Sequence, residues 1–476
     1  MALRLPPAIF RNILSRIILL MAASGAAASG QTSNGAERAD LVIRGGIVVP
    51  MDPARRVLEP GSVAITGNKI AAIGTVAEID ERYTAAATID ASGRIVMPGL
   101  INGHGHAAMT LLRGVADDKA LMDWLQNYIF PAEAKLVDEA FVRAGTRLAL
   151  LEMLLGGTTT YVDMYYFEYA VADETAKAGM RGVIGQAMLD FPAPDFKTWD
   201  ESVAGMEKFL KQWKNHPLIT PAVAPHAPYT VSPEHLQTAA KLAADHGVPI
   251  IIHVSETKAE LATMQERYKA TPIEHLDRLG VLKPNLIAKH VVWATDQELL
   301  TLKKHGVGVV HNPQSNMKLA SGIAPVPKML ELKIPVALGT DGASSNNDLD
   351  MWGEIDTVAK LHKVATLDAT VVSAREAVAM GTIEGARAIH MADRIGSLEV
   401  GKLADVIIVG LDAAHEVPLY DVYSHLAYTV KASDVETVVV GGKVVVEKRV
   451  PKTLDPPAIF AEARRYRDKV RAVVGK

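Results

Sequence analysis

The chain has 476 residues, of which 49% are hydrophobic and 22% charged, a composition typical of a globular enzyme with one large domain and a smaller satellite. Lysine and arginine total 50 against 54 aspartates and glutamates, which excludes the strongly basic surface expected of a nucleic-acid or anionic-membrane binder. There is no cysteine, so disulfides, thiolate–metal sites and cysteine nucleophiles are excluded, and any metal must be held by histidines and carboxylates.

Residues 1–28 are typical of a secretory signal peptide. Arg4, Arg11 and Arg16 precede a short apolar run at 17–28, which ends in three alanines and is too short for a permanent membrane-spanning helix. We therefore expect export to the periplasm or the cell exterior, with no membrane attachment after cleavage. The alternative is an amphipathic extension on a cytoplasmic enzyme. The polar residues 29–38 are expected to form a flexible lead-in.

Short strand-forming runs mark both ends of the expected mature chain. Those between 41 and 99 are separated by Gly45-Gly46 and Gly67-Asn68, and those between 404 and 449 contain Gly441-Gly442. We interpret all three pairs as hairpin turns. Because the termini of compact proteins tend to meet, the pattern predicts one small β-sandwich domain built from residues 39–95 and 399–455. A C-terminal helix is expected at 456–476.

The middle of the chain, residues 96–398, alternates apolar strand-like runs with longer helical stretches, which is the pattern of a parallel α/β fold. The strand-like runs lie near residues 96, 158, 181, 218, 248, 285, 306 and 334. Eight strands are the number that closes a (β/α)8 TIM-type barrel. Helices are expected at 138–155, at 259–268, and at 232–247 with Ser232 as N-cap and Gly247 as the stop.

In such a barrel the chemistry is carried out at the C-terminal ends of the strands. The ends of the predicted strands carry polar side chains: His104 and His106, Asp163, Gln186, His226, His253, His290, His311 and Asp341. One buried histidine is as often a core residue as a ligand, but several at equivalent positions indicate a metal site.

The two histidines of the first strand give the strongest local signal. His104 and His106 are separated by one residue, so on an extended strand both imidazoles point the same way and can reach one ion. His253 adds a third imidazole at the end of the fifth strand. Asp341 ends the eighth strand, which lies beside the first if the barrel closes.

Six segments carry narrower motifs: PGLINGHGH at 98–106, LMDWLQNYIFPAEAKL at 121–136, APHAPYTVSPE at 224–234, HVSET at 253–257, HNPQSNMKLASGIAPV at 311–326 and GTDGASSNNDLDMW at 339–352. Together they resemble the amidohydrolase superfamily and, within it, the 5′-methylthioadenosine/S-adenosylhomocysteine deaminases. The resemblance covers roughly residues 39–449.

The resemblance implies a single divalent metal ion, zinc first, with iron or nickel as alternatives, held by His104, His106, His253 and Asp341. It also implies that Glu133 contacts the ribose hydroxyls and His226 the nucleoside. Without it, Glu133 would be interpreted as an exposed charge. The fourth strand carries no lysine that could be carbamylated to bridge a second ion, which favours one ion.

The implied activity is hydrolytic deamination of 5′-methylthioadenosine, S-adenosylhomocysteine or adenosine to the inosine-type product and ammonia. By analogy with the non-ligand glutamate of zinc deaminases, we assign Glu256 to bind and protonate adenine N1 and to pass a proton to the leaving amine. His290 would steer the attacking hydroxide, and Asp341 would take the proton of the water.

Alternatives remain at the level of the substrate. The same metal core serves deaminases and chlorohydrolases of guanine, cytosine or triazines, and a nucleoside-binding protein without turnover is a further alternative. The carboxylate tail of S-adenosylhomocysteine would require a guanidinium at the mouth of the site, for which Arg113 and Arg181 are candidates. The expected partner is a small-molecule nucleoside, and a homo-oligomer stays open.

Overall fold

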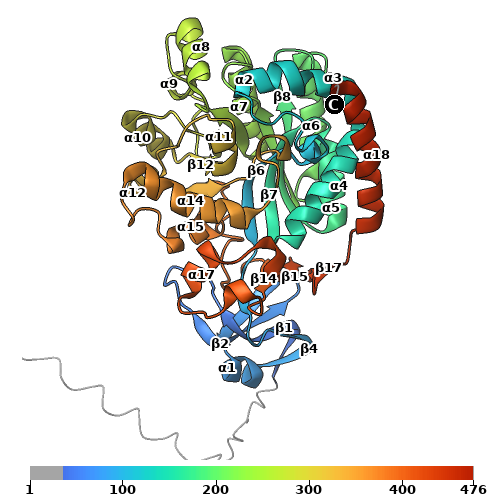
Figure 1. Ribbon diagram of the computed structural model, residues 1–476, viewed down its shortest axis with the longest axis vertical. Coiled ribbons are helices and arrows are strands. Elements are labelled where there is room, and N and C mark those ends of the chain that lie inside the picture. Colours follow the sequence, from blue (N-terminus) through green and yellow to red (C-terminus); the bar gives the residue numbers. More distant parts are fainter. Residues whose placement is uncertain (1–35, 475–476) are drawn as a thin grey trace, which may run out of the picture.

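The computed structural model describes residues 36–474, so the predicted signal peptide lies outside the described residues. At its centre, eight parallel strands form a barrel surrounded by helices (Figure 1). They are β6 (Leu100–Gly105), β7 (Thr158–Tyr165), β8 (Arg181–Met188), β9 (Ile219–Pro225), β10 (Ile250–Val254), β11 (Leu286–His290), β12 (Gly308–His311) and β13 (Val336–Leu338). They pair in chain order, and a parallel bridge between Gly105 and Asp341 connects the last strand to the first. The predicted (β/α)8 barrel is confirmed.

The helices around the barrel begin and end where the sequence predicts. The side chain of Asp138 caps α4 (Glu139–Leu155) by accepting from the amide of Phe141, and Ser232 caps α7 (Pro233–His246), which ends at Gly247 with a φ of 64°. The other helices that follow the first six strands are α5 (Glu168–Ala178), α6 (Trp199–Trp213), α8 (Lys258–Tyr268), α9 (Pro272–Arg278) and α10 (Asp296–His305). After β12 come α11 (Pro313–Lys318), α12 (Val326–Glu331), α13 (Ala343–Asn346), α14 (Met351–Thr366), α15 (Ala374–Met380) and α16 (Ile383–Ala388).

The segment between β6 and α4 is built from short turns of helix. They are η1 (Ala107–Leu112), α2 (Leu121–Trp124), a π-helical turn η2 (Leu125–Ile129) and α3 (Phe130–Leu136). The last of these contacts the C-terminal helix α18 (Pro456–Val474), which also packs along α4 (Figure 1). Residues 121–136 are called the cover segment below.

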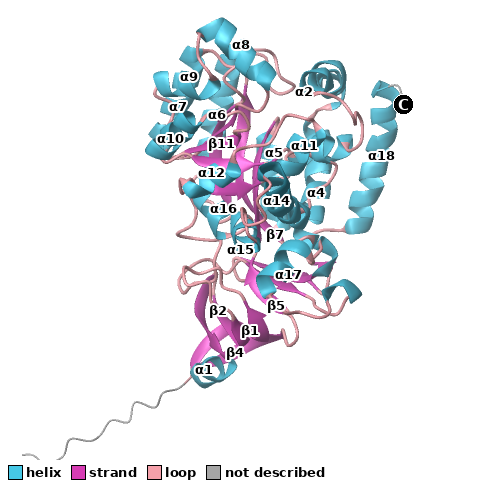
Figure 2. Ribbon diagram, turned by 60° about the vertical axis from the view of Figure 1, so that its left-hand side comes forward, coloured by secondary structure: helices cyan, strands magenta, loops and turns pink. Residues whose placement is uncertain are grey.

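Both ends of the described chain join in a second, mixed sheet of nine strands, which lies at one end of the barrel (Figure 2). Its strands are β1 (Glu37–Val48), β2 (Leu58–Thr66), β3 (Lys69–Thr75), β4 (Tyr83–Asp90), β5 (Ile95–Pro98), β14 (Val406–Val409), β15 (Val435–Val440), β16 (Lys443–Glu447) and β17 (Val450–Pro451). The helix α1 (Val76–Arg82) packs against this sheet. The connection between β14 and β15 contains the short turns η3 (Ala414–Glu416) and η4 (Ala432–Asp434) and the helix α17 (Val422–Tyr428), which packs against α14 and α15. β5 joins the two parts of the chain, because it pairs with β1 and with β14.

Three details of the small sheet differ from the expectations. Gly45-Gly46 is not a hairpin turn, because both residues lie within β1 at a β-bulge, where Gly45 has a φ of 83°. β5 belongs to the small sheet, so the expected boundary between residues 95 and 96 falls inside a strand. β1 begins at Glu37, inside the expected lead-in, because Glu37 pairs with Tyr83 of β4. The turns at Gly67-Asn68 and Gly441-Gly442 are hairpins, as predicted.

The barrel interior is filled by branched side chains from most of its strands, among them Ile101, Val162, Val183, Ile251, Ile287 and Val310. This packed layer lies beneath the polar residues at the strand ends, and it leaves the mouth of the barrel as the place for chemistry. No helix between residues 36 and 474 is both long enough and apolar enough to cross a bilayer.

Candidate active site

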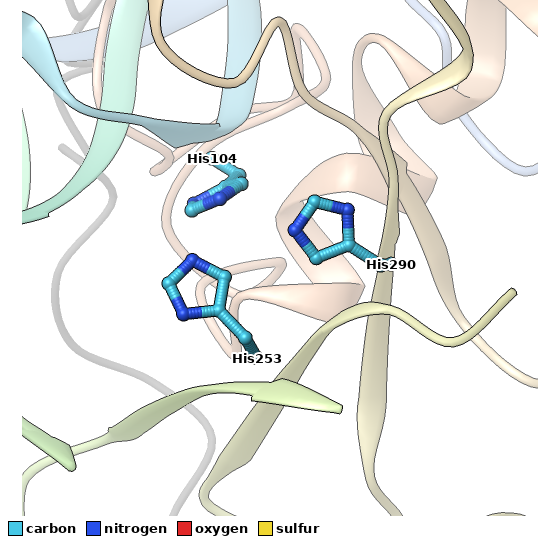
Figure 3. A group of neighbouring side chains, drawn as sticks. All are labelled: His104, His253 and His290. Carbon is cyan, nitrogen blue, oxygen red and sulfur yellow. The ribbon is translucent and has the colours of Figure 1, made fainter. Parts of the chain in front are cut away.

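Histidines from three strands meet at the C-terminal mouth of the barrel. The rings of His104, His253 and His290 point toward one another from β6, β10 and β11 (Figure 3). The ring centroid of His104 lies 5.0 Å from that of His253 and 5.4 Å from that of His290. Because one ring nitrogen from each lies within 4.8 Å of the others, the three imidazoles can face a common ion.

A carboxylate joins the same cluster from the end of the last strand. Asp341 Oδ1 lies 3.3 Å from the Nε2 atoms of both His104 and His106. The hydroxyl of Ser315 donates to Asp341 Oδ2 at 2.7 Å, which fixes the orientation of the carboxylate. The four residues expected to hold a metal therefore converge, although they come from positions 104 to 341.

The hydrogen bonds of two of these histidines fix their tautomers. Nδ1 of His106 lies 2.6 Å from the carbonyl oxygen of Met164, and Nδ1 of His253 lies 2.8 Å from that of His226. A carbonyl can only accept, so each Nδ1 carries a proton, and Nε2 is the nitrogen that each ring presents to the cluster. Such outer hydrogen bonds are the usual support of metal-binding histidines.

His104 gives a further indication that the cluster holds a cation. Its ring is fully buried, and neither ring nitrogen has a hydrogen-bond partner among the described residues. Buried polar atoms are normally satisfied. Imidazole nitrogens together with one carboxylate oxygen are a suitable donor set for zinc, iron or nickel, so the residues present fit the expected metal.

Glu256 lies at the edge of this cluster, just beyond the end of β10. Its Oε2 is 3.7 Å from Nε2 of His290, and its Oε1 accepts from the hydroxyl of Ser321 at 3.3 Å. Burial, with a smaller contribution from the charge of Asp341, raises the pKa of Glu256 to about 8. The carboxyl group is therefore protonated near pH 7 and can act as an acid.

The backbone at Glu256 is held by a second buried acid that the sequence reasoning missed. The carboxylate of Glu260 accepts from the amide of Ser255 at 2.9 Å and from the amide of Glu256 at 2.7 Å. Ser255 has a φ of 54°, a conformation that is uncommon for residues other than glycine. Glu260 thus fixes the sharp turn that directs Glu256 into the site.

His290 is positioned by the segment after β12. The Nδ2 atom of Asn312 lies 3.0 Å from Nδ1 of His290, and an amide that donates there leaves the proton of the neutral ring on Nε2, facing Glu256. Burial lowers the pKa of His290 to about 4, so the ring is neutral. Asn312 and Ser315 belong to a motif that the sequence analysis identified without assigning roles to its polar residues.

Glu133, on the cover segment, is buried in the site and is not an exposed charge. Its Oε1 accepts from the hydroxyl of Tyr165 at 2.6 Å, and burial raises the pKa of its carboxyl group to about 7. His226, which follows β9, is also at the site, and burial lowers its pKa to about 4. Both residues line the same cleft as the histidine cluster.

That cleft has a volume of about 700 Å³, including the space open to solvent at its mouth. Its ionisable lining residues are His106, Glu133, His226, His253, Glu256, His290 and Asp341. The apolar lining comes mostly from the cover segment, with Leu121, Trp124, Leu125, Ile129 and Phe130, together with Leu189, and the tyrosines Tyr165, Tyr166 and Tyr229 also line the cleft. This lining suits an aromatic ligand with a polar edge.

Three other strand-end residues have structural contacts. Asp163 accepts from the amide of Ala107 at 2.7 Å, and Gln186 donates to Asp195 at 2.7 Å. His311 faces His362 on α14, with 3.4 Å between their Nε2 atoms. All three side chains satisfy or orient neighbouring groups of the fold.

Comparison with known proteins agrees with this geometry. The Amidohydrolase family model matches residues 95–445. The chain is 49% identical to the 5-methylthioadenosine/S-adenosylhomocysteine deaminase of Syntrophobacter fumaroxidans, over 90% of this chain and 98% of that protein.

Two solved structures share the fold. One is an adenosine deaminase from Xanthomonas campestris with bound zinc, with a TM-score of 0.91 and 41% identity over 92% of this chain and all of that one. The other is the atrazine chlorohydrolase TrzN from Arthrobacter aurescens with zinc, with a TM-score of 0.83 and 26% identity over 90% of this chain and 99% of that one. These matches confirm the resemblance found in the motifs, and the chain belongs to the amidohydrolase family.

Proposed function

We propose that this protein deaminates an adenosine-type nucleoside by metal-dependent hydrolysis, giving the inosine-type product and ammonia. The observation that carries the proposal is the buried carboxyl group of Glu256, whose Oε2 lies 3.7 Å from Nε2 of His290 at the edge of a cluster of histidines and one aspartate. A glutamate that is not a metal ligand is the proton shuttle that deamination of an aminopurine requires. The deaminase relatives described above support the same reaction.

His104, His106, His253 and Asp341 would hold one divalent ion, and zinc agrees with the zinc bound in both solved relatives. Nε2 of His104 and Nε2 of His106 both lie 3.3 Å from Asp341 Oδ1, and Nδ1 of His106 and of His253 is bonded to a carbonyl oxygen, which supports a ligand set made of Nε2 atoms and this carboxylate. When bound, such an ion supplies a hydroxide nucleophile near neutral pH by lowering the pKa of a water.

The side chains of the cluster then divide the proton transfers among them. Asp341 takes the proton that the water loses, and the Nε2–H of His290 orients the nucleophile toward C6 of the purine. Glu256 donates its proton to N1, so the ring can accept the electron pair as the C6–O bond forms. Glu256, now ionised, takes the proton of the hydroxyl group on C6 and passes it to the exocyclic nitrogen. The C6–N bond breaks, ammonia leaves and the C6 carbonyl forms, and the proton held by Asp341 then returns Glu256 to its acid form.

Glu133 and His226 would bind the nucleoside on the side away from the reacting carbon. The carboxylate of Glu133 is a suitable acceptor for the ribose hydroxyls, and the bond from Tyr165 holds it in place. A buried carboxylate that accepts two hydroxyl groups distinguishes a nucleoside from a free base, because a free purine leaves that carboxylate unsatisfied. This favours an adenosine analogue over guanine, cytosine or a triazine.

The experiment is a substrate panel assayed on protein with measured metal content. Methylthioadenosine, 5′-deoxyadenosine, adenosine, adenine, guanine, cytosine and a chlorotriazine are compared by absorbance change and ammonia release. We expect turnover of the nucleosides and little of the free bases. Turnover of the triazine or guanine alone would overturn the proposal, and calorimetric binding without spectral change would indicate a binding protein.

We also propose that the protein is exported, on the strength of the charged and apolar pattern of residues 1–28. The test is the N-terminal sequence of protein recovered from a periplasmic extract. A chain that begins near residue 29 supports export, and an intact N-terminus in the cytosolic fraction contradicts it.

A further inference from the structure

We infer that Lys289 is a positioning residue for the metal site, because it holds, from across the barrel, the backbone of the strand that carries His104 and His106. The inference rests on the proposed function, since the ion that it concerns is the one assigned to those histidines. The proton transfers proposed above make no use of this lysine.

Lys289 is a fully buried amine inside the barrel. It lies on β11, directly before His290. Ile287, two residues earlier, belongs to the packed layer of the barrel interior, and side chains two residues apart on a strand share a face. Because Lys289 is nearer the C-terminal end of the strand, its side chain lies between that layer and the polar residues of the mouth. It does not line the cleft, so it has no direct contact with a substrate there.

The amine reaches the backbone next to the first metal ligand. Nζ of Lys289 donates to the carbonyl oxygen of Gly103, the residue directly before His104. The register of β6 against β7 shifts between Asn102 and Gly105, so this carbonyl lies at an irregularity of the ladder. A buried carbonyl group needs a hydrogen-bond donor, and Lys289 supplies one from a strand that does not pair with β6.

The neighbouring backbone groups of this irregularity are held as well. The amide of His104 donates to Oδ1 of Asn102 at 3.3 Å, and its carbonyl oxygen accepts from the amide of Asp341 at 3.0 Å. A Cβ atom on Gly103 would lie 2.9 Å from Cβ of Ala337, so β6 packs directly against β13. Among these hydrogen bonds, the one from Lys289 is made by a side chain of another strand that is not itself a proposed ligand.

A lysine in this position carries a free-energy cost. Lysine is rarely buried completely unless it is paired. Burial lowers the pKa of Lys289 well below its usual value, although the carboxylates of Asp163 and Asp341 act in the opposite direction. An apolar side chain of the same length would fill the space without desolvating an amine. The contact that offsets this cost is the hydrogen bond to Gly103, which indicates that the site needs it.

The first test is the affinity of the protein for Zn²⁺. Lys289→Met removes the amine and keeps an unbranched apolar chain, so the carbonyl of Gly103 loses its donor and the backbone before His104 can relax. We expect the Kd for Zn²⁺, measured by competition with a chromophoric chelator, to rise by about 10-fold or more. An unchanged Kd would overturn the inference.

The matched control is Ile287→Ala, which removes packing from the same strand and the same interior. It touches no group that holds a ligand, so its Kd for Zn²⁺ should stay within about 3-fold of the wild type, whatever its effect on Tm. A rise equal to that of Lys289→Met would mean that any loss of packing in the barrel weakens metal binding, and Lys289 would then have no special role.

Chemical restoration of the amine tests the hydrogen bond itself. The chain contains no cysteine, so the thiol of Lys289→Cys can be alkylated at one position while the chain is unfolded. Bromoethylamine gives a side chain of the length of lysine with a terminal amine, and bromopropane gives one of the same length that ends in a methyl group. After refolding, the Kd for Zn²⁺ should be within about 3-fold of identically treated wild type for the first protein and about 10-fold higher or more for the second. Equal affinities of the two alkylated proteins would overturn the inference. This pair decides the question if Lys289→Met does not fold.

The Kd measurements also separate this inference from the proposed reaction. If the wild type binds Zn²⁺ but deaminates no adenosine analogue, the proposed reaction fails, and the comparison of Kd values still decides the role of Lys289. If the wild type binds Zn²⁺ and deaminates adenosine while all variants bind the ion equally well, the role of Lys289 fails alone. A wild type that does not bind Zn²⁺ would contradict both.

Discussion

At the scale of single residues, the site places two acids of opposite function within one cleft. The pKa of Glu256 is raised to about 8 by burial, whereas that of Asp341 is lowered well below its usual value because the imidazoles of His104 and His106 outweigh its burial. One carboxyl group thus holds a proton that it can donate, and the other is held as a carboxylate, the form that a metal ligand needs. Different surroundings assign opposite roles to the same type of group.

Replacing the acid alone should separate chemistry from metal binding. Glu256→Gln keeps the size and the contact with Ser321 but cannot donate or shuttle the proton, so we expect kcat to fall by at least about 100-fold. Metal content, measured by elemental analysis, should equal that of the wild type, because Glu256 is not among the expected ligands. A variant with unchanged kcat would assign the proton transfer to another residue.

Tyr165 should control the pH dependence of ribose binding. Its hydrogen bond lowers the pKa of Glu133, while burial raises it to about 7. Ionised Glu133 is the better acceptor, so KM for adenosine should rise as the pH falls through about 7. In Tyr165→Phe the lowering contact is absent, so the pKa of Glu133 rises and the KM transition should move to higher pH.

The measurement is KM between pH 5.5 and 9 for adenosine and for a 2′,3′-dideoxy analogue. The analogue serves as the control, because without ribose hydroxyls its KM should not follow the ionisation of Glu133. The same pH profile for both nucleosides, or a transition that moves to lower pH in Tyr165→Phe, would contradict the assignment of Glu133 to the sugar.

Residue types and spacing were enough to predict that His104, His106, His253 and Asp341 meet, because side chains that end parallel strands of a barrel share one mouth. The same reasoning could not find Glu260 or Ser321. Their roles depend on the turn after β10 and on the loop that contacts it, and no repeat or period in the sequence encodes those contacts. Glu133 required the family resemblance, since burial of one glutamate has no local signal.

At the scale of secondary-structure elements, the ends of the strands store backbone strain. Ser255, His290, Val291 and Asp341 all have φ between 48° and 70°, although none is glycine. Such conformations cost about 1–3 kcal/mol each and persist where surrounding contacts enforce them. Here they lie at the ends of β10, β11 and β13, and two of them, His290 and Asp341, line the cleft.

Glu260 is the contact that enforces the turn after β10. In Glu260→Ala the amides of Ser255 and Glu256 lose their acceptor while buried, at a cost of about 1–3 kcal/mol each. We expect a lower Tm and a reduced kcat, because Glu256 is no longer held in place. Glu266→Ala, an exposed position on the same helix α8, is the control.

The split between kcat and KM distinguishes positioning from general loss of structure. A displaced Glu256 reduces kcat while KM for adenosine stays within about 3-fold, since the contact proposed between Glu133 and the sugar is unaffected. In Glu260→Gln the amide oxygen can accept one of the two bonds, so kcat should lie between the alanine variant and the wild type. Loss of stability with a normal kcat per folded molecule would contradict the positioning role.

Sequence patterns predict an element boundary where the signal is local, and they fail where the boundary depends on distant contacts. Ser232 and Gly247 bound α7 because a capping side chain and a positive-φ glycine act locally, and the sequence displays both. Gly45-Gly46 has the composition of a turn, yet it forms a bulge because β1 continues to pair with β2 on both sides of it. The bulge depends on pairing with a strand that is distant in the sequence, and local composition does not indicate such pairing.

At the scale of the whole molecule, the small sheet closes the end of the barrel opposite the cleft. A buried ion pair fastens the two together: Arg181, at the start of barrel strand β8, contacts Asp405, just before β14. Both side chains are at most 3% exposed. Asp405 also accepts from the amide of Gly441 in the β15–β16 hairpin at 2.7 Å, so one carboxylate connects three segments.

Breaking this pair should destabilise the protein without altering the cleft. Arg181→Met leaves Asp405 buried with an unpaired charge, which we expect to lower the free energy of unfolding by about 3–5 kcal/mol. In the double variant Arg181→Met, Asp405→Leu neither charge of the pair is left, so most of that stability should return, reduced by loss of the bond from Gly441 to Asp405 and of the bond from Arg181 to the carbonyl oxygen of Pro217. Denaturant unfolding of the single and double variants measures both effects, with kcat/KM as the check on the site. If Arg181→Met unfolds at the same denaturant concentration as the wild type, the ion pair does not stabilise the contact between the small sheet and the barrel. If the double variant is no more stable than the single one, the lost stability comes from the changed packing and not from the unpaired charge.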